Sequence, residues 1–374
     1  MQPLQGLRVV EIGDGLASAL AALTLAEAGA EVVKVISPTQ ADEARSGGAD
    51  ATAIEFALRN RGKKSVIVNL DDQGAHAELQ PLLADADVLI EETRPGTLDD
   101  LGLGYDAAKA LNSKLIYCSI SGYGQTGPMA REGSQDLNRL GATGLLRLSA
   151  DAGGAPVLPA ARIGDIAAGA FPCVINILLA LRSRDATGEG CRLDLAIADT
   201  LFTFTYATIG TAALSRNWPE PGNEALTGGS PRYQLYATSD GRYVAVAAIE
   251  DRHWENLCER LELEDELRDD ARAPDETRRA LAAIIGARTA EFWRDKFENR
   301  DLCCSVVADL EQAVANPQFR DRGLFDRKIR FHGGELDAVV TPLAPQFRGE
   351  STTEEAPEPG NADPGNADKV LEPQ

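Results

Sequence analysis

Residues 7–36 read LRVVEIGDGLASALAALTLAEAGAEVVKVI, and this stretch decides the fold. It contains a short β-rich run (LRVVEI), an amphipathic helical run (LASALAALTLAEAG) and a second β-rich run (EVVKVI). The same rhythm continues through the runs KSVIVNL, ADVLIEE and KLIYCSI. Alternating strands and helices are typical of βαβ units, which build a mainly parallel sheet with helices on its faces. The sequence therefore predicts an α/β fold with a large, Rossmann-like domain.

Length and charge limit the classes of protein to which the chain can belong. Its 374 residues allow two or three domains and a large core. The 58 acidic and 37 basic residues give a net charge of −21, which argues against nucleic acid or an anionic membrane as a partner. The longest apolar run, residues 171–181, is shorter than the roughly 20 residues of a membrane helix. Because the first residues lack the order of a signal peptide, we expect a cytoplasmic protein.

The cysteine and histidine residues give no sign of a metal. The six Cys residues lack the CxxC spacing of a zinc site and the density of a disulfide scaffold, and the three His residues are widely spaced. We therefore expect no metal site, and we interpret most of the Cys residues as small core residues.

Changes in composition suggest where the domains begin and end. Pro, Gly and Asn cluster at residues 216–231, as in a linker or an active-site loop. We predict a large α/β domain over residues 1–215, a linker and a small α+β domain over 216–325, and a return to the large domain over 326–350. The acidic, Pro- and Gly-rich tail over 351–374 is expected to be disordered.

The pattern Gly13-x-Gly15-x-x-Ser18 follows a strand and opens a helix, so it loosely matches a dinucleotide-binding fingerprint. Ser18 replaces the third Gly, and Ser37 stands where a ribose-binding carboxylate is expected. The sequence also lacks a GxxxxGK[ST] phosphate loop. These departures argue against a nicotinamide or flavin cofactor and against an ATPase or kinase.

Two basic sites are candidates for binding an anion. The run from Arg59 to Lys64 is a dense basic cluster in a strongly acidic chain, and it fits a phosphate-binding patch as well as a solvated loop. Arg94 lies in EETRPG, after an expected strand, where α/β folds place their ligands. An exposed Arg in a turn is the alternative interpretation of Arg94.

Asp165 opens an apolar run that continues to about Arg184. This run predicts a buried helix that begins at a carboxylate, with Pro172 either starting or kinking it.

Several segments, in this order, resemble the class III (CaiB/BaiF) CoA-transferases and the related α-methylacyl-CoA racemases. They cover nearly all of residues 3–350 and include PLQGLRVVEIG, LRNRGKKSVIVNL, ADVLIEETRPGTLDDLGLGYDAAKALNSKLIYCSISGYGQTGP, IGDIAAG, TGEGCRLDLAIADTL and NPQFRDRGLF. The resemblance implies that Asp165 is the catalytic carboxylate and that Gly228 and Gly229 lie over the active site. It implies that the basic loop binds the CoA nucleotide, and Arg61, Lys63 and Lys64 are its candidates. It also implies a CoA thioester as substrate, no permanently bound cofactor, and an interlocked dimer whose active site lies between the large domain of one chain and the small domain of the other.

The two activities of this family use the carboxylate differently. A transferase uses it as a nucleophile, whereas a racemase uses it as one of two acid/base groups on opposite faces of the α-carbon. In the racemases the second group is a His in a Gly-His-Asp-x-Asn sequence, and here Gln135 takes the place of that His. Glutamine donates a hydrogen bond but cannot exchange a proton. Glu250 matches a racemase-like carboxylate, although it could also be a carboxylate at a helix N-terminus.

These observations favour a CoA-transferase that moves CoA between an acyl-CoA and a carboxylic acid, most simply as a homodimer. Asp165 is its expected nucleophile, and Gln135 and Glu250 are further candidates for its active site. The alternatives are a 2-methylacyl-CoA racemase or epimerase and a non-catalytic partner subunit of a heteromeric CoA-transferase. A nicotinamide oxidoreductase rests only on the weak Gly13-x-Gly15 match.

Overall fold

The computed structural model describes residues 2–45, 51–72, 74–151, 153–298, 300–331, 333–349, 353–355 and 358–362. The chain divides into two compact units, each described separately below. The first comprises Met1–Thr143, Pro159–Phe204 and Pro317–Gln374, and the second comprises Gly144–Leu158 and Thr205–Asn316. The main inserted segment therefore runs from 205 to 316, whereas the sequence predicted 216 to 325.

The first unit is built on a six-stranded parallel sheet with the strand order β3-β2-β1-β4-β5-β6. This is the order of the doubly wound dinucleotide-binding fold, and it confirms the predicted Rossmann-like α/β architecture. The order reverses between β1 and β4, which leaves a crevice at the carboxyl ends of these two strands. The strands are β1 Arg8–Gly13, β2 Glu31–Ile36, β3 Lys64–Ile67, β4 Val88–Glu92, β5 Ile116–Ser121 and β6 Arg192–Ala196.

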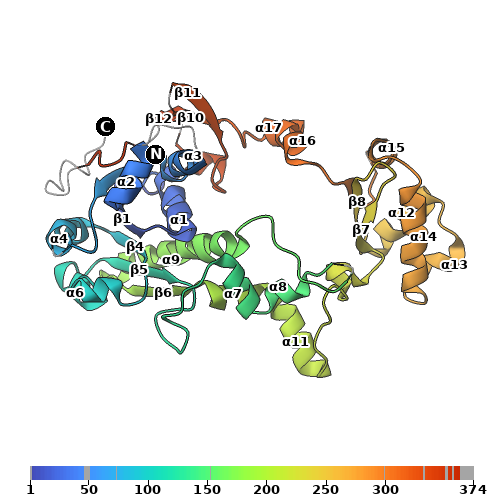
Figure 1. Cartoon of the computed structure of the whole chain (residues 1–374), viewed down its shortest axis with the longest axis horizontal. Coiled ribbons are helices and arrows are strands. Elements are labelled where there is room, and N and C mark those ends of the chain that lie inside the picture. The colour runs from blue at the N-terminus through green and yellow to red at the C-terminus, as the bar shows by residue number, and fades with distance from the viewer. Residues whose placement is uncertain are drawn as a thin grey trace. The chain divides into compact units, whose positions relative to one another are not determined.

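Helices cover both faces of this sheet, because successive residues of a strand point to opposite sides. Tyr117 of β5 joins an apolar cluster with α4 (Ala75–Asp85) and α6 (Tyr105–Leu111). Its neighbour Cys118 faces the other side, where its Sγ lies 3.6 Å from the Sγ of Cys173 in α9. On that side α9 (Phe171–Thr187) packs against α1 (Leu16–Glu27), as Figure 1 shows.

Helix α9 is buried on one face only, which corrects the expected fully buried helix. Cys173, Ile177 and Ala180 are buried, whereas Ile175 and Leu179 are 57% and 63% exposed. The helical segment Gly164–Thr187 has 24 residues and, by length and composition alone, is long and apolar enough to cross a membrane. This too differs from the sequence-based expectation. Half of the most apolar 18-residue part of this segment is buried inside the fold. Helices in the core of a protein can be equally long and apolar.

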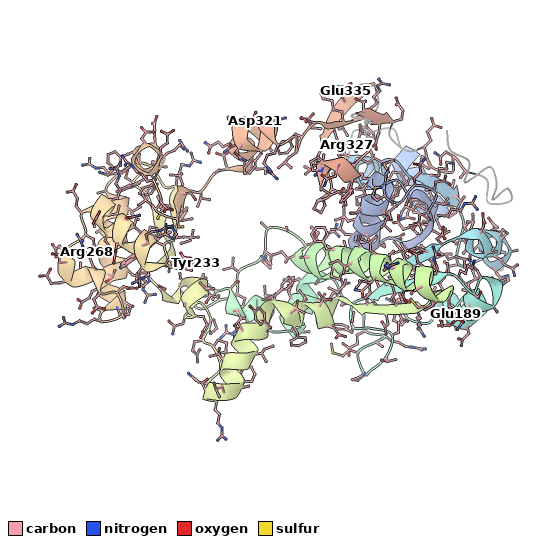
Figure 2. All side chains as sticks on the ribbon, turned by 180° about the vertical axis from the view of Figure 1, so that it is seen from behind. Glu189, Tyr233, Arg268, Asp321, Arg327 and Glu335 are labelled. Carbon is pink, nitrogen blue, oxygen red and sulfur yellow. The ribbon has the colours of Figure 1, made fainter. Side chains whose placement is uncertain are left out.

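The chain returns to the first unit after residue 316 and forms a small sheet with the order β11-β10-β12. Its strands are β10 Arg327–Phe331, β11 Gly334–Ala338 and β12 Thr353–Glu355, and Figure 2 labels Arg327 and Glu335 in it. Strand β12 and residues 358–362 belong to the tail that we expected to be disordered. Around the edge strand β3, the Ser65 amide donates to Asn361 Oδ1 (2.8 Å), and the Ala362 amide donates to Ser65 O (3.0 Å). For these described residues the expectation of disorder is wrong, because they cover an edge that would otherwise lack partners.

Glu27, at the end of α1, holds the returning chain in place. Its Oε2 accepts hydrogen bonds from the Thr341 amide (3.1 Å) and hydroxyl (2.5 Å), 314 residues away. Its Oε1 pairs with Arg61 Nη2 at 2.7 Å, and the same nitrogen donates to Val339 O at 2.8 Å. All these contacts are buried or partly buried, so both ends of the sequence contribute to one core.

The second unit contains an antiparallel sheet with the order β7-β8-β9, in which a turn at Gly241 joins the first two strands. Gly241 has a φ of 75°, which a residue without Cβ adopts readily. Helices pack on this sheet through Trp254, Leu257 and Trp293. Figure 2 labels Tyr233 and Arg268 in this unit. Its main elements are β7 Tyr233–Ala237, β8 Tyr243–Ala247, β9 Cys304–Val306, α12 Asp251–Leu261, α14 Pro274–Gly286 and α15 Ala290–Phe297.

The remaining helices connect these elements. They are α2 Pro38–Arg45, α3 Ala51–Asn60, α5 Thr97–Asp100, α7 Asp136–Ala142, α8 Leu145–Leu148, α10 Ile197–Leu201, α11 Tyr206–Ser215, α13 Asp265–Arg268, α16 Leu310–Ala315 and α17 Pro317–Asp321.

Candidate active site

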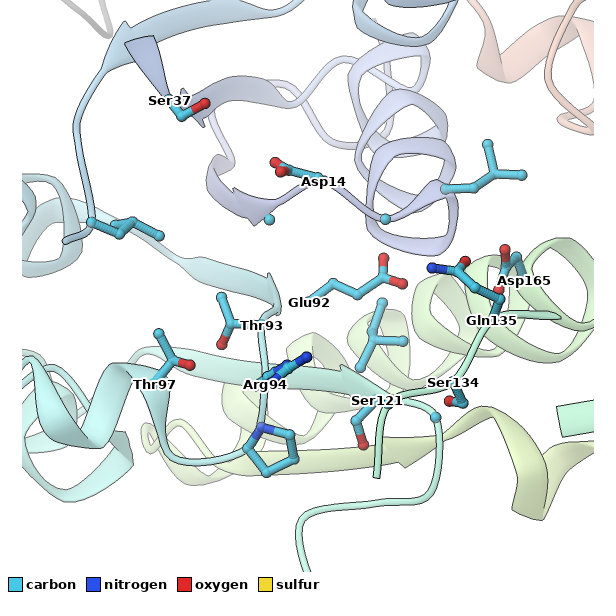
Figure 3. Close-up of a pocket in the computed structure, with 18 of the residues that line it drawn as sticks. Asp14, Ser37, Glu92, Thr93, Arg94, Thr97, Ser121, Ser134, Gln135 and Asp165 are labelled. Atoms are coloured by element: carbon cyan, nitrogen blue, oxygen red, sulfur yellow. The ribbon is translucent and has the colours of Figure 1, made fainter. Parts of the chain in front are cut away.

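A cavity of about 710 Å³ opens in the first unit at the crevice where the strand order reverses. Gly13 at the end of β1, Glu92 at the end of β4 and Ser121 at the end of β5 line it, together with Gln135 and Asp165 (Figure 3). Ligands of open α/β sheets bind at this position, because the loops that follow the strands diverge there. The cavity is therefore the candidate active site.

Asp165 is held at this cavity by its neighbours on α7. Its side chain is buried, and its Oδ1 accepts a hydrogen bond from Arg139 Nη1 at 2.5 Å. Its backbone amide donates to Asp136 Oδ1 at 2.8 Å. A Cβ on Gly164 would lie 2.6 Å from that same oxygen, so the glycine before Asp165 lets Asp136 approach. The helical turn at Gly164–Ala170 then leads directly into α9.

The charge of Asp165 is set by opposing effects. Burial raises the pKa of this carboxyl, the Arg139 guanidinium lowers it, and the nearby Asp136 carboxylate raises it, with a net upward shift. A carboxylate whose charge is incompletely compensated is more basic and more nucleophilic than one in water. Arg139 itself is fixed through Ser134, since its Nε donates to the Oγ (3.1 Å) and its Nη2 to the backbone oxygen (2.8 Å).

Glu92 supplies a second carboxylate that the sequence analysis missed. Its Oε2 accepts a hydrogen bond from the Ser18 amide, near the start of α1, at 2.8 Å. Burial raises the pKa of Glu92, the hydrogen bonds from Ser18 lower it, and the charge of Asp165 raises it, with a net upward shift. The charge of Asp165 therefore contributes to the raised pKa of Glu92, which lines the same cavity.

The glycines of the dinucleotide-like pattern make room for this carboxylate. A Cβ on Gly15 would lie 1.8 Å from Glu92 Cδ, and a Cβ on Gly13 would lie 2.7 Å from the Glu92 backbone oxygen. In a dinucleotide-binding fold the corresponding glycines let the backbone approach a pyrophosphate. Here a protein carboxylate occupies the space against the start of α1, which explains the partial match to the fingerprint.

Gln135 lies directly before α7, and its backbone amide donates to Asn138 Oδ1 at 3.0 Å. Its side chain is exposed at the cavity, and in Figure 3 its amide points into the space between Glu92 and Asp165. Arg94 also lines the cavity with an exposed side chain. The structure therefore brings three sequence-predicted residues, Asp165, Gln135 and Arg94, to one cavity.

The basic run behaves differently from the sequence-based expectation. Lys63 Nζ is buried and donates to Glu11 Oε2 (2.7 Å), Ala19 O (2.9 Å) and Asn60 Oδ1 (3.2 Å). Arg61 is buried as well, and its guanidinium donates hydrogen bonds to Glu27 Oε1 and to the backbone oxygen of Val339 in the returning chain. Lys64 is half-buried in β3. The nitrogen atoms of Arg61 and Lys63 already donate hydrogen bonds within the protein. This corrects the expectation that these two residues contact phosphate, because their role in the structure is to stabilise the fold.

Glu11 is the centre of this buried charge cluster. Its second oxygen, Oε1, pairs with Lys34 Nζ at 2.6 Å. Burial by itself raises the pKa of Glu11, but the attraction of Lys34 and Lys63 outweighs it and lowers the pKa to about 2. Burial lowers the pKa of Lys63 to about 8 against the attraction of Glu11, and the Lys34 ammonium adds to the lowering. One carboxylate thus faces two ammonium groups.

The remaining predicted residues belong to the second unit. Gly228 has a φ of 109°, and its oxygen accepts from Gln234 Nε2 (2.9 Å) and Arg278 Nη1 (3.2 Å). A Cβ on Gly229 would lie 2.0 Å from the Asn223 backbone oxygen, so the fold of this loop itself requires both glycines. Glu250 directly precedes α12 and is exposed, as the helix N-terminal alternative anticipated.

Comparison with known proteins identifies the family of the chain. The family model described as CoA-transferase family III matches residues 4–363. Alpha-methylacyl-CoA racemase from Homo sapiens is 31% identical over 386 residues, which cover 99% of this chain and 97% of the racemase. Succinyl-CoA:glutarate CoA-transferase from Mus musculus is 31% identical over 336 residues, which cover 87% of this chain and 76% of that protein. A solved structure of a CaiB/BaiF family protein from Brucella suis has a TM-score of 0.77 and 27% identity, and the match covers 99% of this chain and 98% of that one.

The family model extends over almost the whole chain, and relatives of both activities match most of it. This protein therefore belongs to CoA-transferase family III.

Proposed function

We propose that this enzyme transfers CoA from an acyl-CoA thioester to a carboxylic acid, with Asp165 as the nucleophile. The observation that carries the proposal is the buried Asp165 carboxylate, which lines a cavity of about 710 Å³ and has a raised pKa. Covalent catalysis by a carboxylate needs only this one reacting side chain. The absence of a His at position 135 therefore does not prevent it.

The proposed reaction exchanges bonds at Asp165 in four balanced steps. The carboxylate attacks the thioester carbonyl and CoA leaves as a thiolate, which gives a mixed anhydride. The thiolate then attacks the aspartyl carbonyl of this anhydride, so the donor acid leaves and an aspartyl CoA thioester remains. The acceptor carboxylate attacks this thioester and releases the thiolate again. Attack of the thiolate on the acceptor carbonyl finally forms the new acyl-CoA and restores the Asp165 carboxylate.

Neighbouring side chains support this chemistry without reacting. Arg139, fixed by Ser134, orients the Asp165 carboxylate and keeps it ionised as substrate displaces water. The exposed Arg94 lines the cavity, where it would attract an anionic group of CoA or of the acid.

The covalent intermediate provides the test of the proposed function. Wild-type protein incubated with an acyl-CoA and quenched with hydroxylamine should give a hydroxamate at Asp165, detected by peptide mass spectrometry. The same treatment without acyl-CoA is the control. Acyl transfer that proceeds at full rate with no adduct at Asp165 would overturn the nucleophilic role.

Gln135→Ala is expected to lower kcat for transfer by roughly 10–1000-fold without abolishing it, because its amide can donate to the oxyanion that forms on the thioester carbonyl. The hydroxylamine-sensitive adduct should still form, only more slowly. Gln135→Glu, which keeps the length of the side chain but removes the donor, should behave like the Ala variant. Unchanged kcat in both variants would remove Gln135 from the active site.

A second candidate function, racemisation of a 2-methylacyl-CoA, is favoured by Glu92. Two-base chemistry needs a second proton carrier, and Glu92 lines the same cavity as Asp165 with a raised pKa. One carboxylate would remove the α-proton and the other would deliver a proton to the opposite face. The racemase relative supports this alternative, although no His is present at position 135.

Glu92→Gln separates the two functions. If the enzyme racemises, the variant should lose at least about 100-fold in wash-in of α-deuterium from heavy water, since one of two proton carriers is gone. If it transfers CoA, the wild type should show no α-exchange, and Glu92→Gln should still form the Asp165 adduct. Glu132→Gln, which changes another carboxylate of the cavity lining, is the matched control.

The assembly and location of the enzyme complete the proposal. We propose a homodimer, interlocked as in the family, because Tyr206 and Leu214 of α11 and Leu179 of α9 are 77%, 90% and 63% exposed. Each of these two helices thus exposes large apolar side chains, as is typical of subunit contacts. In that dimer, Gly228, Gly229 and Glu250 of one chain would meet the cavity of the other. A cytoplasmic location stays a prediction from the sequence.

A further inference from the structure

Four polar side chains converge in the second unit although they come from distant parts of the sequence. Glu250 and His253 lie at the start of α12, and Asp301 and Cys303 lie just before β9. His253 Nδ1 lies 2.9 Å from Glu250 Oε2 and 3.3 Å from Cys303 Sγ. On the other side of the ring, His253 Nε2 lies 3.0 Å from Asp301 Oδ1.

We propose that Glu250, His253 and Cys303 form a binding site for a divalent zinc ion. One ligand atom from each residue lies within 4.8 Å of the other two. Zinc accepts this mixture of a carboxylate oxygen, an imidazole nitrogen and a thiolate sulfur, whereas magnesium and calcium prefer oxygen alone. Glu250 and His253 are three residues apart, so the start of α12 places both on one face.

Two of the three separations between the ligand atoms are close to those around a tetrahedral ion. Bonds of about 2.3 Å to sulfur and about 2.0–2.1 Å to nitrogen and oxygen separate S from N by about 3.6 Å and N from O by about 3.4 Å. The observed separations of 3.3 and 2.9 Å need only a small outward movement. Glu250 can provide it, because its side chain is 68% exposed.

Asp301 supports the same assignment from the opposite side of the His253 ring, where it faces Nε2. A histidine that binds a metal through one nitrogen commonly donates its other N–H to a carboxylate, which fixes the tautomer. Asp301 is placed to accept that hydrogen bond from Nε2. Arg252 Nη2 lies 3.0 Å from Asp301 Oδ2 and pairs with this carboxylate. The same Nη2 lies 3.0 Å from Nε2, so Arg252 has to move away from the ring when Nε2 carries the proton, which its 70% exposed side chain allows.

Charge and access also suit an ion. The Glu250 carboxylate and a Cys303 thiolate together neutralise the two positive charges of zinc, and the net charge of −21 attracts cations. Cys303 is exposed, so the ion can enter from solvent. Three protein ligands leave a fourth position for water or a substrate group. With zinc bound, Glu250 would not be free to carry protons.

Zinc binding can be measured without reference to catalysis, so its failure would not affect the proposed transferase. Chelator-stripped, reduced full-length protein would be titrated with zinc against a chromophoric chelator, in excess magnesium to suppress weak binding to acidic groups. We expect one equivalent to bind. Cobalt in place of zinc should give intense visible bands of a tetrahedral ion and a sulfur-to-metal charge-transfer band.

Variants identify the ligands. Cys303→Ser and His253→Gln should abolish the stoichiometric binding, and Asp301→Asn should weaken it by roughly 10–100-fold. The matched control is Cys304→Ser, because this neighbouring thiol donates to Leu302 O and lies outside the group. Zinc should also slow alkylation of Cys303 in the wild type, a measurement that does not depend on the folding of any variant.

Three results with the wild-type protein would overturn the site. They are less than one equivalent of zinc bound by the wild type, a cobalt spectrum without the sulfur band, and alkylation of Cys303 at the same rate with and without zinc. Binding that survives Cys303→Ser would likewise assign the ion to the acidic surface instead.

Discussion

Asp165→Asn is expected to lower kcat for acyl transfer by roughly 10⁴–10⁶-fold, the range seen when the nucleophile of a covalent enzyme is removed. Asparagine has nearly the shape of aspartate, but its amide cannot attack a thioester. The measurement is the rate of CoA transfer between two acids, together with the hydroxylamine-sensitive adduct, which should disappear. Because burial and Asp136 raise the pKa of Asp165, the wild-type rate should also fall on the acid side at a pH above that of an ordinary aspartate.

The control for this prediction separates chemistry from folding. Asp185→Asn changes an exposed aspartate further along the same apolar helical segment and should leave the rate unchanged. Asp165→Asn leaves the buried Arg139 without its carboxylate partner, so its melting temperature should be compared with that of the wild type. A folded variant with activity within a few-fold of the wild type would show that Asp165 is not the nucleophile.

Glu11→Gln is expected to destabilise the protein by about 3–5 kcal/mol, because it leaves the buried Lys34 and Lys63 ammonium groups without a counter-charge. Denaturant unfolding near neutral pH would measure this loss. Lys63→Met is the matched variant, and it should cost less because it leaves a balanced Glu11–Lys34 pair. A larger loss for Lys63→Met than for Glu11→Gln would contradict the charge balance described above.

The pH dependence of this effect has a defined sign. The folded pKa of Glu11, about 2, lies below its ordinary value of 4.5, so its ionisation stabilises the fold above that value. As the pH falls from 4.5 towards 2, the unfolded chain takes up this proton while folded Glu11 stays ionised, so unfolding becomes more favourable and the stabilisation is lost. The difference in unfolding free energy between wild type and Glu11→Gln should therefore shrink over that interval.

The alternation of strands and helices in residues 7–36 predicted the parallel sheet, because periodicity reports directly on which faces are buried. Local patterns failed where burial depends on distant partners. The run from Arg59 to Lys64 looked like an exposed charged loop, yet Lys63 is neutralised by Glu11, which lies 52 residues earlier. Charge density along the chain cannot distinguish these two situations.

The candidate site was predictable only in part for the same reason. The motif order identified Asp165, but Arg139 and Glu92 reach it from α7 and β4, which meet only in the folded sheet. Two signals were available. Arg139 follows Gln135 by about one helical turn. Glu92 is the last residue of β4, next to the point at which the strand order of the sheet reverses. The group around His253 had no local signal, since Cys303 is 50 residues away.

The hydrogen bonds of Glu27 to Thr341 also constrain how the protein can be made on the ribosome. Residues 205–316 emerge as a continuous segment and can form their own core, but the first unit needs residues from 317 onward. Until residues 341 and 361 have emerged, Glu27 of α1 lacks its hydrogen bonds from Thr341, and the backbone of Ser65 in β3 lacks its cover. Incomplete sheets with open edges are prone to pair with other chains. The first unit is therefore completed only after the second has been made, and its sheet edge at β3 stays open until the returning residues reach it.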